Sequence, residues 1–149
     1  MSLSIRKAQK TDVEQIEVLE QEAFPTSYWP LKQIEYELTT NPVAILLVVL
    51  DEDKVVGYLD FDITFDSATI CRIAVRKDYR KKGIASSLLL AMENILGKQP
   101  DKVSFITLEV RVSNVEARKL YQKMKYEEVT IKKKYYDDGE DAVYMVRYL

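Results

Sequence analysis

A chain of 149 residues, with 47% hydrophobic and 31% charged side chains, has the composition of one globular domain with a buried core. Its 22 basic and 24 acidic residues give a net charge of −2, so the domain as a whole is not built to bind a polyanion such as nucleic acid. The absence of histidine excludes histidine-dependent nucleophiles and histidine metal sites, and the one cysteine, Cys71, excludes an internal disulfide. We therefore expect no metal cofactor, and proton chemistry has to come from carboxylates, tyrosines, lysines or Cys71.

The N-terminal part of the chain predicts a strand and two helices. Residues 3–8 alternate apolar and polar side chains, as a half-buried strand does. Thr11 and Glu14 have the spacing of a capping box, which predicts the start of a helix. The segment "FPTSYWP", residues 24–30, breaks that helix because proline disrupts a helix interior, and a second helix follows.

Three strands are expected next, at residues 43–50, 55–65 and 68–75. The first of these is the longest apolar run, but a membrane-spanning helix takes about 20 such residues, so we interpret it as a buried strand. The third leads into a basic segment, residues 76–82, and then into an apolar helix that begins after Gly83.

The C-terminal part predicts another strand at residues 103–112 and a helix opened by a second capping box, Ser113 with Glu116. A hairpin at residues 127–149, with a "DDG" turn, closes the chain. The order β-α-α-β-β-β-α-β-α-β-β predicts a mixed α/β sheet with helices on both faces, in one domain spanning residues 1–149. No signal-peptide pattern is visible near the N-terminus, so we expect a cytoplasmic protein without a membrane anchor.

The segment around Gly83 has the features of a phosphate site. A helix N-terminus presents unpaired N–H groups and about half a positive charge. Gly83 permits close approach of a ligand to the backbone, the small Ala85 and Ser86 keep the first turn open, and the neighbouring basic side chains add charge. A solvated helix start remains the alternative, because neither a Walker loop nor a dinucleotide fingerprint is present.

The segment "IAVRKDYRKKGIA" resembles the acyl-CoA motif of the GNAT acetyltransferases at Arg80, Gly83 and Ala85. The element order is also that of this family, so the resemblance covers nearly the whole chain. It implies a mostly antiparallel seven-stranded sheet with a central, splayed parallel pair, and acetyl-CoA as co-substrate without a metal. One departure is "MKY", residues 124–126, where the family commonly has L-G-F. The implied cofactor-binding residues are Ile73, Ala74, Val75, Arg80, Lys81, Lys82, Gly83, Ile84, Ala85, Ser86 and Asn114.

Three residues of "TLEVRVSNVEARKLYQKM" are candidates for the chemistry, and each has an ordinary structural alternative. Glu109 lies mid-strand on a face that solvent could reach, Asn114 could be a simple helix cap, and Tyr121 could be a core aromatic residue. "LEVRVSN" followed by "LY" is similar to the N-terminal acetyltransferases, most specifically to the ribosomal-protein-alanine (RimI) type. That resemblance implies that Glu109 accepts a proton, Asn114 contacts the cofactor and Tyr121 donates a proton.

Two aromatic segments resemble the substrate-binding parts of the same enzymes. "FPTSY" supplies Phe24, Pro25 and Tyr28, and "KKYYDDGEDAVYM" supplies Tyr135 and Tyr136. We expect them to flank the open end of the splayed strands and to form an aromatic slot for an extended peptide end.

The favoured interpretation is an acetyl-CoA-dependent enzyme that acetylates the N-terminal α-amine of a protein or peptide, with a ribosomal protein as a candidate acceptor. The alternatives are acetylation of lysine side chains or of a small amine, and acyl-CoA binding without catalysis. A nucleic-acid-binding module is the weakest option, because the chain is acidic overall and lacks a recognition motif. We expect a monomer or a weak dimer.

Overall fold

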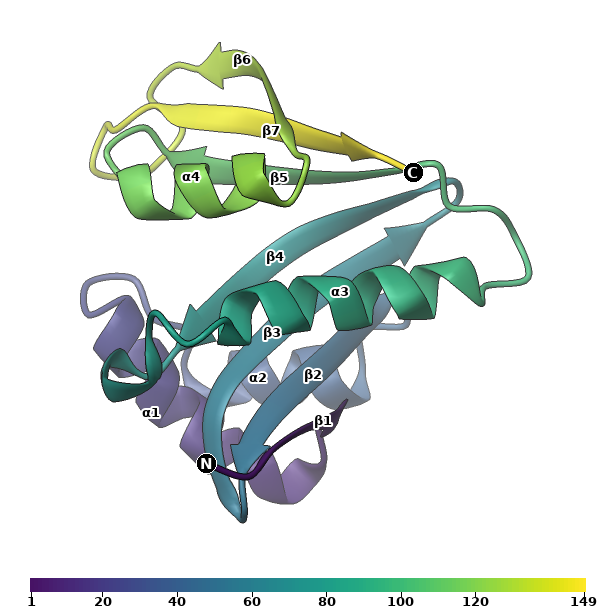
Figure 1. Ribbon diagram of the computed structural model, residues 1–149. Coiled ribbons are helices and arrows are strands. Elements are labelled where there is room, and N and C mark those ends of the chain that lie inside the picture. The colour runs from purple at the N-terminus through teal and green to yellow at the C-terminus, as the bar shows by residue number, and fades with distance from the viewer.

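The computed structural model describes all residues from Met1 to Leu149 and follows the expected order of elements (Figure 1). Its strands are β1 (Leu3–Lys7), β2 (Ala44–Asp51), β3 (Lys54–Thr64), β4 (Ser67–Val75), β5 (Phe105–Arg111), β6 (Glu127–Lys132) and β7 (Ala142–Tyr148). Its helices are α1 (Val13–Ala23), α2 (Leu31–Thr39), α3 (Ile84–Gly97) and α4 (Val115–Lys123), with short 3-10 turns at Lys10–Asp12 and Lys77–Tyr79. No helix is both long and apolar enough to cross a membrane.

The strands form one seven-stranded sheet in the order β1-β2-β3-β4-β5-β7-β6. Every neighbouring pair is antiparallel except β4 and β5, which are parallel and joined through α3. This confirms the mixed sheet with a central parallel pair. The crossover is the reason for the exception, because a strand that returns through a helix runs in the same direction as the strand before it.

The helices cover the two faces of the sheet and create two cores. On one face, α3 and α4 pack on residues such as Phe61, Ile106 and Leu108, which are almost fully buried. On the other face, α1 and α2 pack on Val48 and Tyr58. Figure 1 shows α3 in front of the sheet and α1 and α2 behind it. Because β2 and β3 are covered on both faces, their side chains are buried in succession, which explains the continuous apolar run in β2.

The expected capping box of Thr11 and Glu14 is wrong. Asp12 instead accepts a hydrogen bond from the Gln9 N–H at 2.7 Å, and its carboxylate also pairs with Arg6 at 2.7 Å. The chain therefore enters a 3-10 turn first, and α1 begins at Val13. The Asp12 carboxylate binds both the Gln9 N–H and Arg6 of β1. These contacts, rather than a Thr11–Glu14 capping box, set the start of the helical segment.

Two other boundaries differ from expectation. Asn114 rather than Ser113 caps α4, because its side-chain oxygen accepts from the Ala117 N–H at 3.2 Å. β6 ends at Lys132 instead of continuing through the tyrosine pair, because Lys134 has a positive φ of 51° and its N–H donates to the Asp141 carboxylate at 2.9 Å. The hairpin therefore has a longer loop than the "DDG" turn alone.

Candidate active site

The segment that leads into α3 presents a row of unpaired N–H groups. The N–H groups of residues 81–86 donate to no acceptor in the protein, whereas the Ser87 N–H donates to the Gly83 carbonyl. Lys81 and Gly83 have positive φ angles of 61° and 79°, and such alternating backbone forms a concave nest for an anion. Nothing lies within 4 Å of the position that a Cβ on Gly83 would take. The geometry therefore fits an anion at the N-terminus of α3.

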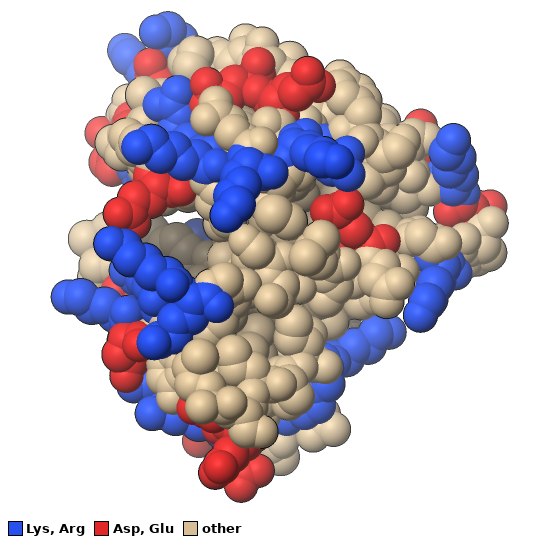
Figure 2. All heavy atoms as spheres, in the orientation of Figure 1, with Lys and Arg blue, Asp and Glu red and all other residues tan.

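β4 and β5 separate at the same end of the sheet. They pair only between Ser67–Thr69 and Phe105–Thr107, so the β4 edge at residues 71–75 has no strand partner on the β5 side. Figure 2 shows the molecule hollowed there, with basic side chains gathered beside the hollow near the start of α3. Arg80 donates through Nε to the Val75 carbonyl at 3.2 Å, which fixes the turn between β4 and α3. An extended ligand could pair with this open strand edge.

Glu109 lies two residues beyond the last β4–β5 pair, on the edge of this gap. Its side chain is 17% exposed, and Oε2 accepts from Lys132 Nζ at 3.0 Å. The Tyr135 hydroxyl contacts Oε1 at 3.4 Å. Glu109 raises the pKa of Lys132, first through this hydrogen bond, so the lysine stays charged. The weakly contacted Oε1 is the oxygen that remains available to a substrate.

The β6–β7 loop brings the tyrosine pair to Glu109. Tyr135 and Tyr136 meet edge to face at 5.0 Å between ring centroids, and the Arg111 guanidinium stacks on Tyr136 at 4.1 Å. Arg111 also pairs with Asp138 and Glu140 at 2.8 and 2.9 Å, which anchors the loop to β5. The loop is therefore held over β5 by one arginine.

Tyr121 is 5% exposed, and its ring lies 5.6 Å from that of Tyr126. Burial raises the pKa of Tyr121, and the neighbouring Tyr136 hydroxyl raises it further, so the phenol is protonated at neutral pH.

Lys125, where the family commonly has glycine, has a φ of 74°, so the turn after α4 keeps a left-handed residue despite the substitution. Asn114 uses its side-chain oxygen as the α4 cap, which leaves its amide nitrogen available to a ligand.

Arg72 fixes the α1–α2 segment to β4. Its guanidinium contacts both carboxylate oxygens of Glu20, at 3.2 and 3.1 Å, and donates to the Ser27 carbonyl at 2.7 Å. It also lies over the Phe24 ring at 4.0 Å and the Trp29 ring at 5.0 Å. Glu20 is fully buried and also accepts from the Trp29 N–H at 2.7 Å. The aromatic segment is thereby held by a residue next to the open strand edge.

Residues 10–126 match the acetyltransferase (GNAT) family. The chain belongs to that family. It is 34% identical to a putative ribosomal protein bS18-alanine N-acetyltransferase of Bacillus subtilis, over 95% of this chain and 93% of the relative. It is also 34% identical to an N-alpha-acetyltransferase of Saccharolobus solfataricus, over 97% of this chain and 92% of the relative. The crystal structure of the ribosomal-protein-S18-alanine N-acetyltransferase from Escherichia coli has 29% identity and a TM-score of 0.87, over 99% of this chain and 94% of that one.

This GNAT domain brings most of the predicted site residues to one end of the sheet. Tyr135 contacts both Glu109 and Tyr136. The start of α3 at Gly83 and the α1–α2 segment border the same open end of the sheet (Figure 1). Tyr28 is 41% exposed, and no hydrogen bond or aromatic ring pair joins it to Tyr135 or Tyr136.

Sequence reasoning missed three basic residues that hold the site together: Arg72, Arg111 and Lys132. Only Arg72 carried a usable signal, because it is the one charged residue inside the strand segment "ATICRIAV". Arg111 resembles any polar residue of an alternating strand, and Lys132 is one of three consecutive lysines. Their partners in α1, the β6–β7 loop and β5 become evident only from the three-dimensional structure.

Proposed function

We propose that this GNAT domain transfers the acetyl group of acetyl-CoA to the N-terminal α-amine of a protein, with a small first residue such as alanine or serine. The observation that carries the proposal is the position of Glu109 at the gap between β4 and β5. The unpaired N–H row of residues 81–86 borders the same gap. A thioester held along β4 and an amine held near Glu109 would meet there.

The donor would bind along β4 and the start of α3. The open edge at Ile73–Val75 can pair with the amide groups of an extended pantetheine arm, and the N–H row can hold the pyrophosphate. Lys81 and Lys82 are exposed and can add charge-assisted contacts. The free amide nitrogen of Asn114 can donate to the cofactor from the other side of the gap.

In the proposed reaction, the acceptor amine attacks the thioester carbonyl carbon and forms the C–N bond, and the C–S bond then breaks. Glu109 takes the proton that the nitrogen loses, and the neutral Tyr121 gives its proton to the departing thiolate. Both groups then exchange protons with solvent and return to their starting states. An α-amine has a pKa near 8 and a lysine side chain near 10.4, so an α-amine needs less help to react at neutral pH.

The acceptor class is supported by the relatives and by the aromatic loops. The similar proteins of B. subtilis, S. solfataricus and E. coli are named as alanine or N-alpha-acetyltransferases. Phe24, Pro25 and Tyr28 on one side, and Tyr135 and Tyr136 on the other, offer rings and hydroxyls to an extended peptide end. A ribosomal protein is the acceptor that the bacterial relatives suggest.

Two peptides of one sequence test the proposal, each beginning with alanine and containing one lysine. In the first, the α-amine is free and the lysine is blocked, and in the second the blocking is reversed. We expect acetylation of the first peptide to be faster, measured by mass spectrometry. Faster acetylation of the second peptide would instead identify a lysine acetyltransferase. If neither reacts while acetyl-CoA binds, the peptide-acceptor proposal is wrong, and the alternatives left are a small-amine acceptor and acyl-CoA binding without catalysis.

A further inference from the structure

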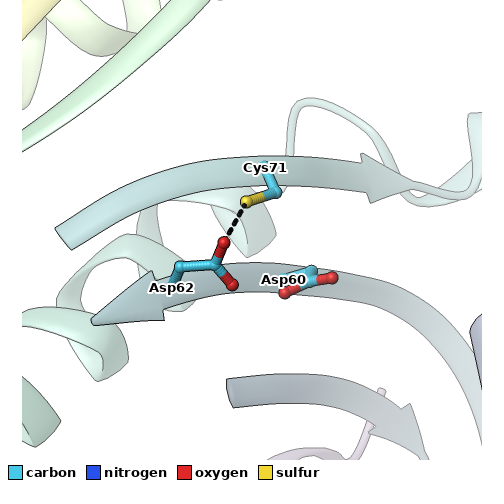
Figure 3. A group of neighbouring side chains, drawn as sticks. All are labelled: Asp60, Asp62 and Cys71. Atoms are coloured by element: carbon cyan, nitrogen blue, oxygen red, sulfur yellow. Dashed lines mark hydrogen bonds between the residues drawn. The ribbon is translucent and has the colours of Figure 1, made fainter. Parts of the chain in front are cut away.

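Asp60, Asp62 and Cys71 gather on the sheet face that α1 and α2 cover (Figure 3). One potential ligand atom from each residue lies within 4.8 Å of the other two. The Cys71 thiol donates to Asp62 Oδ2 at 3.4 Å. The cluster joins neighbouring strands, because both aspartates come from β3 and the cysteine from β4.

A β-bulge creates this arrangement. In the β3–β4 pairing, Asp60 lies opposite Arg72 and Phe61 lies opposite Ile70, so Cys71 has no partner. A bulge of this kind places two consecutive side chains on one face of a sheet. Cys71 therefore points to the aspartates while Arg72, on the same face, reaches Glu20 of α1.

Three of the four carboxylate oxygens in the cluster have no hydrogen-bond donor. Asp60 is fully buried, and neither of its carboxylate oxygens has a hydrogen-bond partner. Asp62 Oδ1 is also buried without a partner. Buried carboxylates are normally paired or bind a metal, because desolvation of an unpaired charge is strongly unfavourable. The unpartnered oxygens therefore mark a place for a cation.

No cationic side chain fills that place. The ionisable groups that act on the Asp60 carboxyl are acidic: Glu37 of α2, Asp62 of the same strand and Glu20 of α1. Glu37 is bonded to the neutral Gln33 and Asn41, and the nearby Arg72 is committed to Glu20. The one cation on this face near Asp60, Arg72 of β4, is therefore already paired, and the other charged groups around Asp60 are acidic.

We propose that Asp60, Asp62 and Cys71 bind a divalent metal ion of the Zn²⁺ class. A thiolate together with carboxylate oxygens favours a borderline-soft ion such as Zn²⁺ over Mg²⁺ or Ca²⁺, which take oxygen ligands. Ligands around Zn²⁺ stand about 3.5 Å apart, so small side-chain rotations would close the present set. The thiol loses its proton to solvent when the metal–sulfur bond forms, and a water can complete the coordination.

This site is separate from the proposed acetyl transfer, which needs no metal. Its residues differ from the proposed catalytic pair, Glu109 and Tyr121, and it draws its ligands from the β3–β4 pair. The expectation of no metal cofactor is unchanged, because the proposed ion would be structural; the sequence argument had considered only histidine and multi-cysteine metal sites. An ion here would tie the bulge of β4 to β3 and neutralise the buried acids.

Metal binding is tested on the full chain without a histidine tag. Because the chain itself has no histidine, imidazole ligands cannot obscure the result. We expect the metal-free protein to bind Zn²⁺ in equimolar amount by calorimetry. Co²⁺ should give the near-ultraviolet sulfur-to-metal charge-transfer band of a thiolate complex, which Zn²⁺ should then remove. Thermal unfolding should shift to higher temperature with rising Zn²⁺.

Three variants separate the proposed site from other binding. Asp60→Asn should abolish equimolar Zn²⁺ binding, and without metal it should fold at least as stably as the wild type because it removes a buried carboxyl group that has no hydrogen-bond partner. Cys71→Ser should lose the charge-transfer band. Asp53→Asn, at an exposed turn residue, should behave as the wild type.

Several results would overturn the proposal. They are the absence of saturable Zn²⁺ binding in the wild type, binding that survives Asp60→Asn, and a Co²⁺ complex without the sulfur band. The first of these would leave a cluster neutralised by protons alone. Because metal binding is measured without acetyl-CoA or peptide, these results are independent of the acetyl-transfer proposal.

Discussion

Replacement of Arg72 by methionine should destabilise the domain more than a surface substitution would. The variant keeps an apolar side chain against Phe24 and Trp29 but removes the guanidinium from Glu20, which is fully buried. Breaking a buried ion pair by removal of one partner typically costs about 3–5 kcal/mol. For a domain of this size that corresponds to a fall in Tm of roughly 6–20 °C.

The second member of the pair supplies the control. Glu20→Gln in the Arg72→Met background should recover much of the lost free energy of unfolding, because the buried charge is gone and the amide oxygen can still accept from the Trp29 N–H. Urea denaturation followed by circular dichroism measures the whole domain. The fluorescence of Trp29, the one tryptophan of the chain, reports on the α1–α2 segment itself.

The pH dependence has a definite sign. Burial raises the pKa of Glu20 above its ordinary value even with Arg72 beside it, and loss of the arginine raises it further. A group with a raised folded-state pKa loses its stabilising contribution as the pH rises through that pKa. The free energy of unfolding that Arg72→Met loses relative to the wild type should therefore be larger at about pH 8 than at about pH 4.5. A loss below about 1 kcal/mol, or a double variant no better than the single one, would contradict this account of the ion pair.

Three further results are expected at the site. Gly83→Asn, which tolerates the left-handed backbone and has open space for its Cβ, should keep the fold but weaken acetyl-CoA binding more than about tenfold by calorimetry; unchanged affinity would remove the phosphate role. Glu109→Gln should lower turnover by roughly 10²–10⁴-fold with partial rescue at higher pH, and Tyr121→Phe should lower turnover while acetyl-CoA binding persists; near-normal rates in both variants would return these residues to structural roles. Tyr135→Phe, which removes the hydroxyl beside Glu109, should raise the KM of an N-terminal alanine peptide more than it lowers kcat, and an unaffected KM would argue against peptide contact by this loop.

The element order could be predicted from the sequence because each signal is local. The change from helical to alternating periodicity marks β2, and the glycine after a basic segment marks the start of α3. The parallel pair also followed, since a strand, a helix and a strand in succession imply a crossover. These features depend on neighbouring residues, which the sequence displays directly.

The contacts that shape the site could not be predicted in the same way. Arg72 lies 52 residues from Glu20 and 45 from Ser27, and no local pattern indicates which acid or carbonyl it meets. Lys132 pairs with Glu109 only because β6 and β5 both flank β7. The capping error at Thr11 has a similar origin, since Arg6 of β1 holds Asp12 in place.

The bulge in β4 lets one strand serve three purposes within five residues. Regular alternation would place Cys71 and Arg72 on opposite faces, and a one-residue shift in register reverses the face of every following side chain. With the bulge, Cys71 contacts Asp62 of the acidic cluster and Arg72 binds Glu20 beside the aromatic segment. Ile73–Val75 still pair with β3 and leave an open edge toward β5. The proposed metal site, acceptor segment and cofactor edge are therefore set by the same local backbone, so a change that removes the bulge should disturb all three together.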